Sequence, residues 1–231
     1  VLHLYGYQDI QTPTFEYYEV FRKEIGSTST QELYKFFDRE GNILALRPDI
    51  TPSVARAAAT LFESEDMPIR LCYAGNTFIN HSSYQGRLKE NTQLGAELIG
   101  LDSVEADAEM LAMVADSLKQ IGLQEFQISL GHVDFIRSLL KAAGLGEEES
   151  REIRALITNR NFFGIEEILD AHEVKESVRE AFRLLPELTG GPEVLEQAMI
   201  AAPDLDARLA VTRLQQIFRL HGKSAQELSG A

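Results

Sequence analysis

The stretch that decides the fold is residues 70–100, which read RLCYAGNTFINHSSYQGRLKENTQLGAELIG. Two apolar segments, residues 70–79 and 91–99, flank a polar link at 80–90. This arrangement predicts a long β-hairpin, because each segment has the length and composition of a strand and the link has the composition of a loop.

The second strand of this predicted hairpin alternates polar and apolar side chains. Gln93, Gly95 and Glu97 are two residues apart, so they share one face of the strand. The opposite face should meet a layer of helices with Leu94, Ala96 and Leu98. Polar alternation often means only a solvent-exposed sheet face, but a glycine in mid-strand often marks the close approach of a ligand or another backbone. Both interpretations remain open.

The residues before the hairpin predict further strands and a helix. Residues 7–13 have the pattern of an edge strand that ends at a proline, and residues 32–37 and 43–47 that of a second hairpin. Thr51 is a suitable N-cap and Pro52 suits the first helical position, so we expect a helix over about 52–64.

After the hairpin, Asp102 or Ser103 should cap a helix that runs to Gly122, and residues 125–131 alternate like another strand. The order of these elements favours an α+β fold, in which helices cover one face of an antiparallel sheet.

Helical periodicity dominates from about residue 132 onward. We expect a bundle of short helices at 145–202 and a longer returning helix at 204–221. The predicted organisation is therefore a core at residues 1–131, a mainly helical insertion with its return helix at 132–221, and the tail of a truncated chain at 222–231.

Composition narrows the possible partners of this 231-residue chain. The net charge of −14 repels phosphate backbones and the 22 Lys and Arg are scattered, so nucleic acid is not expected. No apolar stretch is long enough to span a bilayer, and no membrane association is expected. The single Cys72 lies in an apolar run, which is typical of a buried, inert thiol in a reducing, cytoplasmic compartment.

Metal ligands are not evident in the pattern of histidines. His81, His132 and His172 are far apart and lack Cys or His partners at ligand spacing, so neither a metal nor a cofactor is expected.

Four polar residues form the candidate binding set. Asp49 and Thr51 lie in the link between a strand and a helix, where ligand groups are commonly held. Thr51 is equally explained as a helix cap and Asp49 as a residue that stabilises the turn. Asp49, Gln93 and Glu97 together would form a pocket of two carboxylates and an amide. Such a pocket suits an ammonium group or a protonatable ring and repels a phosphate. Arg87 is the obvious cation of the polar link.

These motifs resemble the catalytic core of class II aminoacyl-tRNA synthetases of the histidyl type. Residues 5–16, YGYQDIQTPTFE, resemble the first class II motif, an element of the dimer interface. Residues 46–51, LRPDIT, resemble the histidyl LRPEGT segment that contacts the amino acid, and residues 70–100 resemble the second motif, whose loop covers ATP. The resemblance runs in order from residue 1 to about 131 and implies the class II fold.

One departure from the synthetase pattern bears on activity. After the first strand of the second motif, synthetases carry an arginine that binds the α-phosphate of ATP, whereas this chain has Ile79, followed by Asn80 and His81. A neutral side chain cannot offset charge on a reacting phosphate, and the loss of one such donor typically costs about 3–4 kcal/mol. The resemblance therefore implies a degenerate nucleotide site at Ile79, His81 and Arg87, with no catalytic residue.

Within this superfamily the chain resembles the regulatory subunits of ATP phosphoribosyltransferase, which act in histidine biosynthesis. That resemblance implies a non-catalytic protein that the short-form catalytic subunit needs for activity and for feedback inhibition by histidine. It also implies a class II-type dimer within a hetero-octamer, with histidine bound at the four residues of the candidate set: Asp49, Thr51, Gln93 and Glu97. Two alternatives remain: a divergent histidyl-tRNA synthetase core that uses Arg87 in place of the missing arginine, and a paralogue that serves only as a scaffold.

Overall fold

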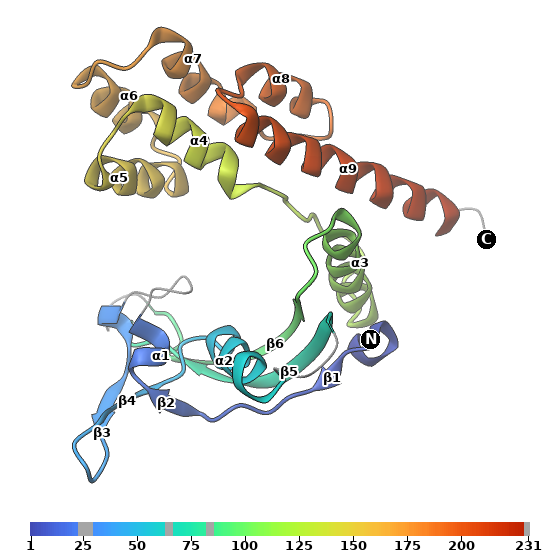
Figure 1. Ribbon diagram of the computed structural model, residues 1–231. Helices are drawn as coiled ribbons and strands as arrows, with labels where there is room; N and C mark the ends of the chain where they lie inside the picture. The colour runs from blue at the N-terminus through green and yellow to red at the C-terminus, as the bar shows by residue number, and fades with distance from the viewer. Residues whose placement is uncertain (23–29, 63–66, 82–85, 229–231) are drawn as a thin grey trace. The chain divides into compact units, whose positions relative to one another are not determined.

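The computed structural model describes residues 1–22, 30–62, 67–81 and 86–228. Helices account for more of this described chain than strands do (Figure 1). The chain divides into two compact units: a sheet unit, residues 1–106 with 113–122, and a helical unit, residues 107–112 with 123–231. This division lies after residue 122, close to the boundary expected after residue 131.

The predicted long hairpin is confirmed. Strands β5 (Ile69–Phe78) and β6 (Glu90–Ile99) pair antiparallel from Ile69 opposite Ile99 to Phe78 opposite Glu90. Strand β1 (Gln8–Asp9) pairs parallel with β5 at the edge of this sheet, in the order β1-β5-β6. The predicted edge strand is therefore present but shorter than residues 7–13. Residues 82–85 of the polar link lie outside the described residues.

A second sheet precedes the long hairpin. Its antiparallel order is β2-β4-β3, formed by β2 (Phe15–Tyr17), β3 (Lys35–Phe37) and β4 (Ile43–Leu46). The predicted hairpin of β3 and β4 is confirmed, and its turn is closed by Asp38, whose Oδ1 accepts from the amides of Asn42 and Glu40 at 2.8 and 3.0 Å. Three short helical segments accompany the two sheets: η1 (Leu2–Tyr5), α1 (Glu19–Arg22) and η2 (Thr30–Glu32).

Helix α2 (Thr51–Leu61) covers the face of the long hairpin that we expected to point away from helices. Ile50 and Val54 pack with apolar residues of β5 and β6, a cluster that includes Ile69, Leu71, Tyr73 and Ile99. The register places these β5 residues on the face of Gln93, Gly95 and Glu97. The predicted orientation of the strand was wrong because the apolar side chains of β5, and not those of β6, select the face that the helix buries. Leu94, expected to be covered, is 65% exposed.

Helix α3 (Val104–Gln120) begins as predicted, since the Ser103 hydroxyl accepts from the Ala106 amide at 3.2 Å. The strand predicted at 125–131 is wrong: these residues form no strand in the structure. Alternation alone does not make a strand, because a strand also needs a neighbour to complete its hydrogen-bond ladder. No described strand pairs with this segment.

The helical unit confirms the expected bundle of short helices. They are followed by α9 (Leu205–Leu228), which continues beyond the predicted end at residue 221. Residues 229–231 of the predicted tail lie outside the described residues. The preceding elements are α4 (Val133–Ala143), α5 (Glu147–Thr158), α6 (Phe162–Asp170), α7 (Glu176–Leu184), η3 (Leu185–Glu187) and α8 (Val194–Ala201).

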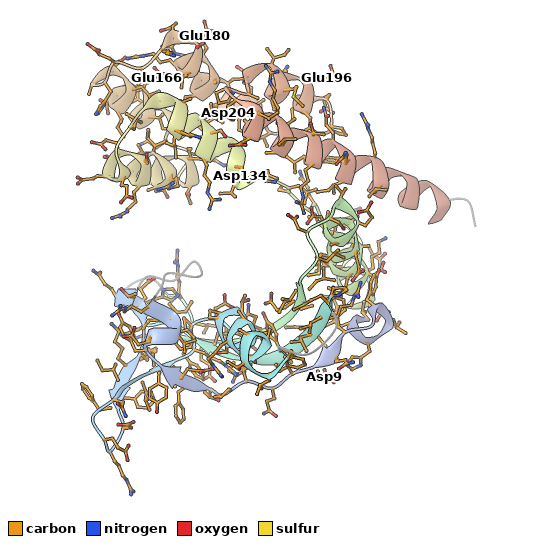
Figure 2. All side chains as sticks on the ribbon, in the orientation of Figure 1. Asp9, Asp134, Glu166, Glu180, Glu196 and Asp204 are labelled. Carbon is orange, nitrogen blue, oxygen red and sulfur yellow. The ribbon has the colours of Figure 1, made fainter. Side chains whose placement is uncertain are left out.

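The interior of the helical unit is apolar. Leu139 of α4, Ile153 of α5, Leu169 of α6, Phe182 of α7 and Val211 of α9 are almost completely buried in one cluster. Glutamates such as Glu166, Glu180 and Glu196 are not part of this cluster (Figure 2). None of the helices in the described part of the chain has the length and apolar character needed to cross a membrane.

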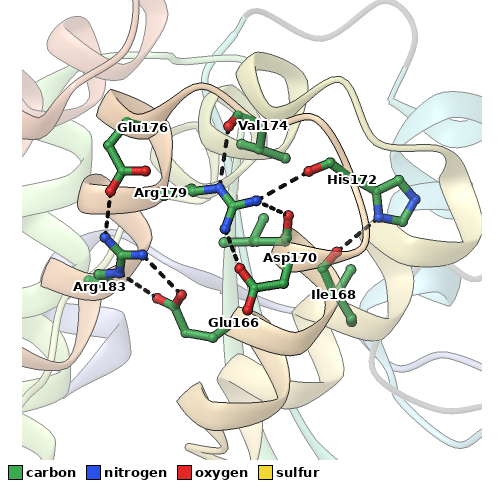
Figure 3. Close-up of polar contacts among 9 residues, drawn as sticks. Glu166, Ile168, Asp170, His172, Val174, Glu176, Arg179 and Arg183 are labelled. Atoms are coloured by element: carbon green, nitrogen blue, oxygen red, sulfur yellow. Dashed lines mark hydrogen bonds and ion pairs between the residues drawn. The ribbon is translucent and has the colours of Figure 1, made fainter.

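Two arginines of α7, Arg179 and Arg183, make hydrogen bonds and ion pairs with neighbouring residues of this unit (Figure 3). Arg179 donates to the backbone carbonyls of Leu169 (2.5 Å), His172 (3.2 Å) and Val174 (3.3 Å), so it closes the end of α6. Arg179 also donates to the carboxylate of Asp170. Arg183 donates to the carboxylates of Glu166 at 3.0 Å and Glu176 at 2.7 Å.

Candidate functional site

The candidate site lies in the sheet unit, where the start of α2 meets β5 and β6. Oε1 of Glu97 accepts from the Thr51 hydroxyl at 2.6 Å and from the Tyr73 hydroxyl at 3.1 Å. The two hydroxyl oxygens are 3.4 Å apart. No hydrogen bond to Oε2 of Glu97 is present among the described residues. The carboxylate is thus held in place by one oxygen, and its second oxygen is available to a ligand.

Tyr73 is a site residue that sequence reasoning missed. It is only 5% exposed and lies opposite Gly95 in the ladder of β5 and β6. A Cβ atom at Gly95 would lie 2.4 Å from Cζ and from the hydroxyl oxygen of Tyr73. The mid-strand glycine therefore makes room for the tyrosine ring, so the close approach is that of a side chain. The register of the hairpin could have revealed this pair.

The environment of Tyr73 keeps its phenol protonated. Burial raises the pKa of Tyr73 to about 12, and the negative charges of Glu97 and Asp49 act in the same direction, while the hydrogen bond with Thr51 opposes them. Tyr73 is therefore a permanent hydrogen-bond donor to Glu97 near neutral pH.

The predicted capping role of Thr51 is wrong. Helix α2 has Ile50 at its N-cap position, and no side chain of that residue closes the helix. Oδ1 of Asp49 instead accepts from the amides of Ile50 at 2.7 Å and Thr51 at 3.4 Å. Because Asp49 satisfies these amides, the Thr51 hydroxyl can bind Glu97.

A pocket of about 270 Å³ opens beside Glu97. Apart from Thr51 and Glu97, it is lined by Ala55, Ala58, Ala59, Met67 and Ile99. Glu97 is the one charged group among these described lining residues. Small apolar walls with a single carboxylate suit a compact cationic ligand, such as an ammonium group attached to a flat ring.

The structure brings Thr51 and Glu97 into contact, whereas neither Asp49 nor Gln93 lines the pocket. Asp49 accepts from the amides at the start of α2. Gln93 lies on the same face of β6 as Glu97, four residues earlier in the strand and opposite Gly75. Its Oε1 atom is buried without a hydrogen-bond donor among the described residues. An unpaired buried acceptor is costly, and this oxygen has the capacity to accept from a donor on a ligand.

Arg47 is a buried cation that the sequence reasoning passed over. The residue is 8% exposed, and its guanidinium group donates to the carbonyls of Asn76 at 2.7 Å and Thr12 at 2.8 Å. Burial lowers its pKa. Gly75 accommodates it, since a Cβ atom there would lie 2.5 Å from Nη2 of Arg47. Arg47 thus joins the segment before β2 to strand β5.

The other end of the hairpin carries the residues expected to mark a degenerate nucleotide site. The Ile79 amide donates to the Lys89 carbonyl at 3.0 Å, and its side chain is half-buried. Nδ1 of His81 lies 3.2 Å from Oε1 of Glu32, so this histidine pairs with η2. Arg87 is exposed.

The paired hairpin, the flanking helix and the site at their junction define a class II aminoacyl-tRNA synthetase-type fold. A model of the histidyl-tRNA synthetase family matches residues 1–229, and the chain belongs to that family.

Curated relatives carry a more specific name. The ATP phosphoribosyltransferase regulatory subunits of Acetivibrio thermocellus and Desulforamulus reducens are each 40% identical to the chain, over 83% and 94% of its length. The chain covers 46% and 54% of these proteins, so it spans about half of the relatives it matches. A crystal structure described as an ATP phosphoribosyltransferase regulatory subunit/histidyl-tRNA synthetase from Bacillus halodurans has a TM-score of 0.86 at 30% identity, covering 96% of this chain and 57% of that one.

Proposed function

We propose that the chain is part of a regulatory subunit of ATP phosphoribosyltransferase, and that its site senses histidine without activating it. The names of the relatives support the first statement. The observation that supports the second is the geometry of Glu97, which is fixed by two hydroxyl donors beside a pocket with no other charged lining group in the described residues.

In this proposal the α-ammonium group of histidine binds Oε2 of Glu97 and the imidazole ring lies against the apolar wall of the pocket. Thr51 and Tyr73 hold the carboxylate in place before the ligand arrives, which reduces the entropic cost of binding. Asp49 and Gln93 contribute a second carboxylate and an amide at the edges of the site, and the buried Oε1 atom of Gln93 gains a donor when histidine is bound.

The proposed lack of adenylation rests on the opposite end of the hairpin. The described residues there place a neutral Ile79 where the family resemblance implies an arginine, and Arg87 is exposed to solvent. A site without a fixed cation does not stabilise the charge that develops on the α-phosphate of ATP.

The proposed assembly joins this subunit to the short-form catalytic subunit in a hetero-octamer, where it is needed for activity. Histidine binding favours one arrangement of the subunit, and its differential affinity for two arrangements is passed to the catalytic partner as feedback inhibition.

Self-association as a class II-type dimer is supported by an apolar face on the second sheet. Phe15 and Tyr17 of β2 and Phe36 of β3 are 50%, 58% and 37% exposed. Phe15 and Phe36 pack edge to face with ring centroids 5.5 Å apart. Exposed aromatic side chains gathered on one sheet face mark a protein interface, and β2 overlaps the end of the segment, residues 5–16, that resembles the first class II motif.

The test uses the full-length protein and titration calorimetry, with histidine and ATP as separate ligands. Histidine should bind and ATP should not. Histidine-dependent exchange of pyrophosphate into ATP would contradict the proposal and support the alternative of a divergent histidyl-tRNA synthetase.

A matched pair of variants tests whether Glu97 binds histidine. Glu97→Gln keeps the shape of the side chain and removes its charge, so histidine affinity should fall about 100-fold, which corresponds to roughly 2.7 kcal/mol. Glu90→Gln removes an exposed carboxylate from the same strand and should bind histidine like the wild type. In the reconstituted complex, Glu97→Gln should abolish histidine inhibition while activation of the catalytic subunit persists. Normal inhibition of this variant would show that histidine binds elsewhere.

A further inference from the structure

A cluster of three potential metal ligands lies at the edge of the first sheet, on the side of β5 that faces away from Tyr73. Nε2 of His3 is 3.0 Å from Oδ2 of Asp9, and Sγ of Cys72 is 3.5 Å from Oδ1 of Asp9. The three ligand atoms all lie within 4.8 Å of one another. Figure 2 shows Asp9 at this edge of the sheet unit.

The backbone assembles this cluster from three elements. The parallel register of β1 and β5 places Asp9 directly opposite Cys72, and the Ile10 amide locks that register by donating to the Cys72 carbonyl at 2.8 Å. Gly6 has a φ of 83°, a left-handed conformation that reverses the chain after η1 and brings His3 back onto Asp9. The convergence therefore depends on the fold and not on closeness in sequence.

The chemistry of the three side chains is that of a zinc site. A thiolate, an imidazole and a carboxylate are the three ligand types that Zn²⁺ prefers in proteins. Tetrahedral zinc with bonds of about 2.0–2.3 Å places its ligand atoms roughly 3.3–3.7 Å apart. The separations of 3.0 Å from His3 to Oδ2 of Asp9 and 3.5 Å from Cys72 to Oδ1 of Asp9 are close to that range. The ligand atoms of His3 and Cys72 lie within 4.8 Å of each other, so a bound ion would draw these side chains closer.

Two of the three potential ligands are exposed to solvent and the third is buried. Cys72 is 2% exposed, whereas the side chains of His3 and Asp9 are 67% and 78% exposed. A cation arriving from solvent would meet the imidazole and carboxylate first and would then be bound by the buried thiolate, with a water molecule as fourth ligand. The histidines singled out from sequence spacing are all different residues, which explains why the pattern did not reveal this group.

We propose that His3, Asp9 and Cys72 form a Zn²⁺ site that ties η1 and β1 to β5. Binding releases the thiol proton of Cys72 to the buffer, and three protein ligands with one water complete the coordination. Because Tyr73 follows Cys72 on β5, the metal fixes the strand that carries the donor to Glu97.

The test is a titration of the untagged, metal-free full-length protein with Co²⁺, a spectroscopic substitute for Zn²⁺. One equivalent should give the visible absorption of a four-coordinate cobalt ion together with a near-ultraviolet band for charge transfer from thiolate to cobalt. Added Zn²⁺ should remove both signals. Absence of the thiolate band in the wild-type protein would overturn the proposal.

Variants separate this site from adventitious binding. His3→Gln changes an exposed residue, so the variant should fold, and its affinity for Co²⁺ should fall at least ~100-fold, since even the loss of a residue that only orients a metal ligand costs about 10–100-fold. Cys72→Ser should lose the charge-transfer band. His172→Gln, an exposed histidine of the helical unit, is the control and should bind like the wild type. Equal Co²⁺ affinity in His3→Gln and the wild type would assign the metal to other residues and overturn the site.

Discussion

The two units of the molecule differ in what they bury. The helical unit has an interior of aliphatic and aromatic side chains, and Ser138 is its one buried polar residue within the described range. The sheet unit instead buries a set of polar side chains: Thr12, Glu16, Arg47, Ser53 and Thr77. Buried polar groups cost free energy unless they are hydrogen-bonded. Arg47, Glu16 and Thr77 all have hydrogen-bond partners, so buried polar contacts help to hold the sheet unit together. The helical unit is instead held by apolar packing.

If the helical unit is packed only for stability, its core variants should change unfolding and nothing else. Phe182→Ala should lower the free energy of unfolding by about 3–5 kcal/mol, because it removes a ring that is 2% exposed. Urea denaturation of the full-length protein measures this loss. Well below the unfolding midpoint, histidine affinity should stay unchanged, since Glu97, Thr51 and Tyr73 lie in the other unit. A parallel fall in histidine affinity would break the comparison.

A glycine variant tests the packing of the sheet unit at the site. Gly95→Ala should cost about 1–3 kcal/mol and should weaken histidine binding, because the new methyl group displaces Tyr73 from Glu97. In a Tyr73→Ala background the same change should cost much less, and the double-mutant cycle measures that coupling. Gly131→Ala is the control, since no atom lies within 4 Å of the position of its Cβ.

The two arginines of α7 sharpen the comparison within the helical unit. Arg179→Gln should lower the free energy of unfolding by about 1–2 kcal/mol, because the carbonyls of Leu169 and His172 lose their donors. The ion pair with the exposed Asp170 is also lost, but a surface pair contributes little. Arg183→Gln breaks only exposed ion pairs and should leave the unfolding midpoint unchanged. Equal losses in both variants, measured by thermal unfolding, would mean that surface ion pairs also stabilise this unit.

The parts of the fold that followed from sequence are those with strong local signals. The long hairpin and the start of α2 were predictable, because alternation and the proline at position 52 act within a few residues. Residues 125–131 also alternate but form no strand, since pairing depends on a partner distant in sequence. The apolar side chains of β5 determine which face of the hairpin α2 buries. The alternation within β6 alone does not reveal that face.

The candidate site was predictable to a similar extent. Thr51 and Glu97 are in contact, because the fold brings a strand-to-helix link against a neighbouring strand. Asp49 contacts only the amides that follow it in the link. Tyr73 and Arg47 were missed, since their importance arises from register and burial. Each contacts a glycine of the long hairpin, Gly95 or Gly75, and that pairing appears only when the ladder is known.

Removal of the Tyr73 hydroxyl should have the smallest effect on the free energy of unfolding. The dependence of that effect on pH distinguishes it from other small losses of stability. Tyr73→Phe should cost about 1 kcal/mol near neutral pH, because Glu97 loses one of two donors. The pKa of Tyr73 is about 12 in the folded protein and near 10 when the chain is unfolded, so the folded state favours the protonated phenol. This contribution is complete below pH 10 and is lost as the pH rises from 10 through 12, where the unfolded chain binds fewer protons.

Unfolding curves of wild type and Tyr73→Phe at increasing pH measure this difference. The stability gap between them should be constant up to about pH 10 and should shrink above it, because only the wild type loses the tyrosine contribution. Tyr17→Phe removes an exposed hydroxyl of the same unit and should leave stability at neutral pH unchanged. A gap that stays constant to pH 12 would mean that the Tyr73 hydroxyl is not buried against Glu97, and the polar interior of the sheet unit would then lack its central contact.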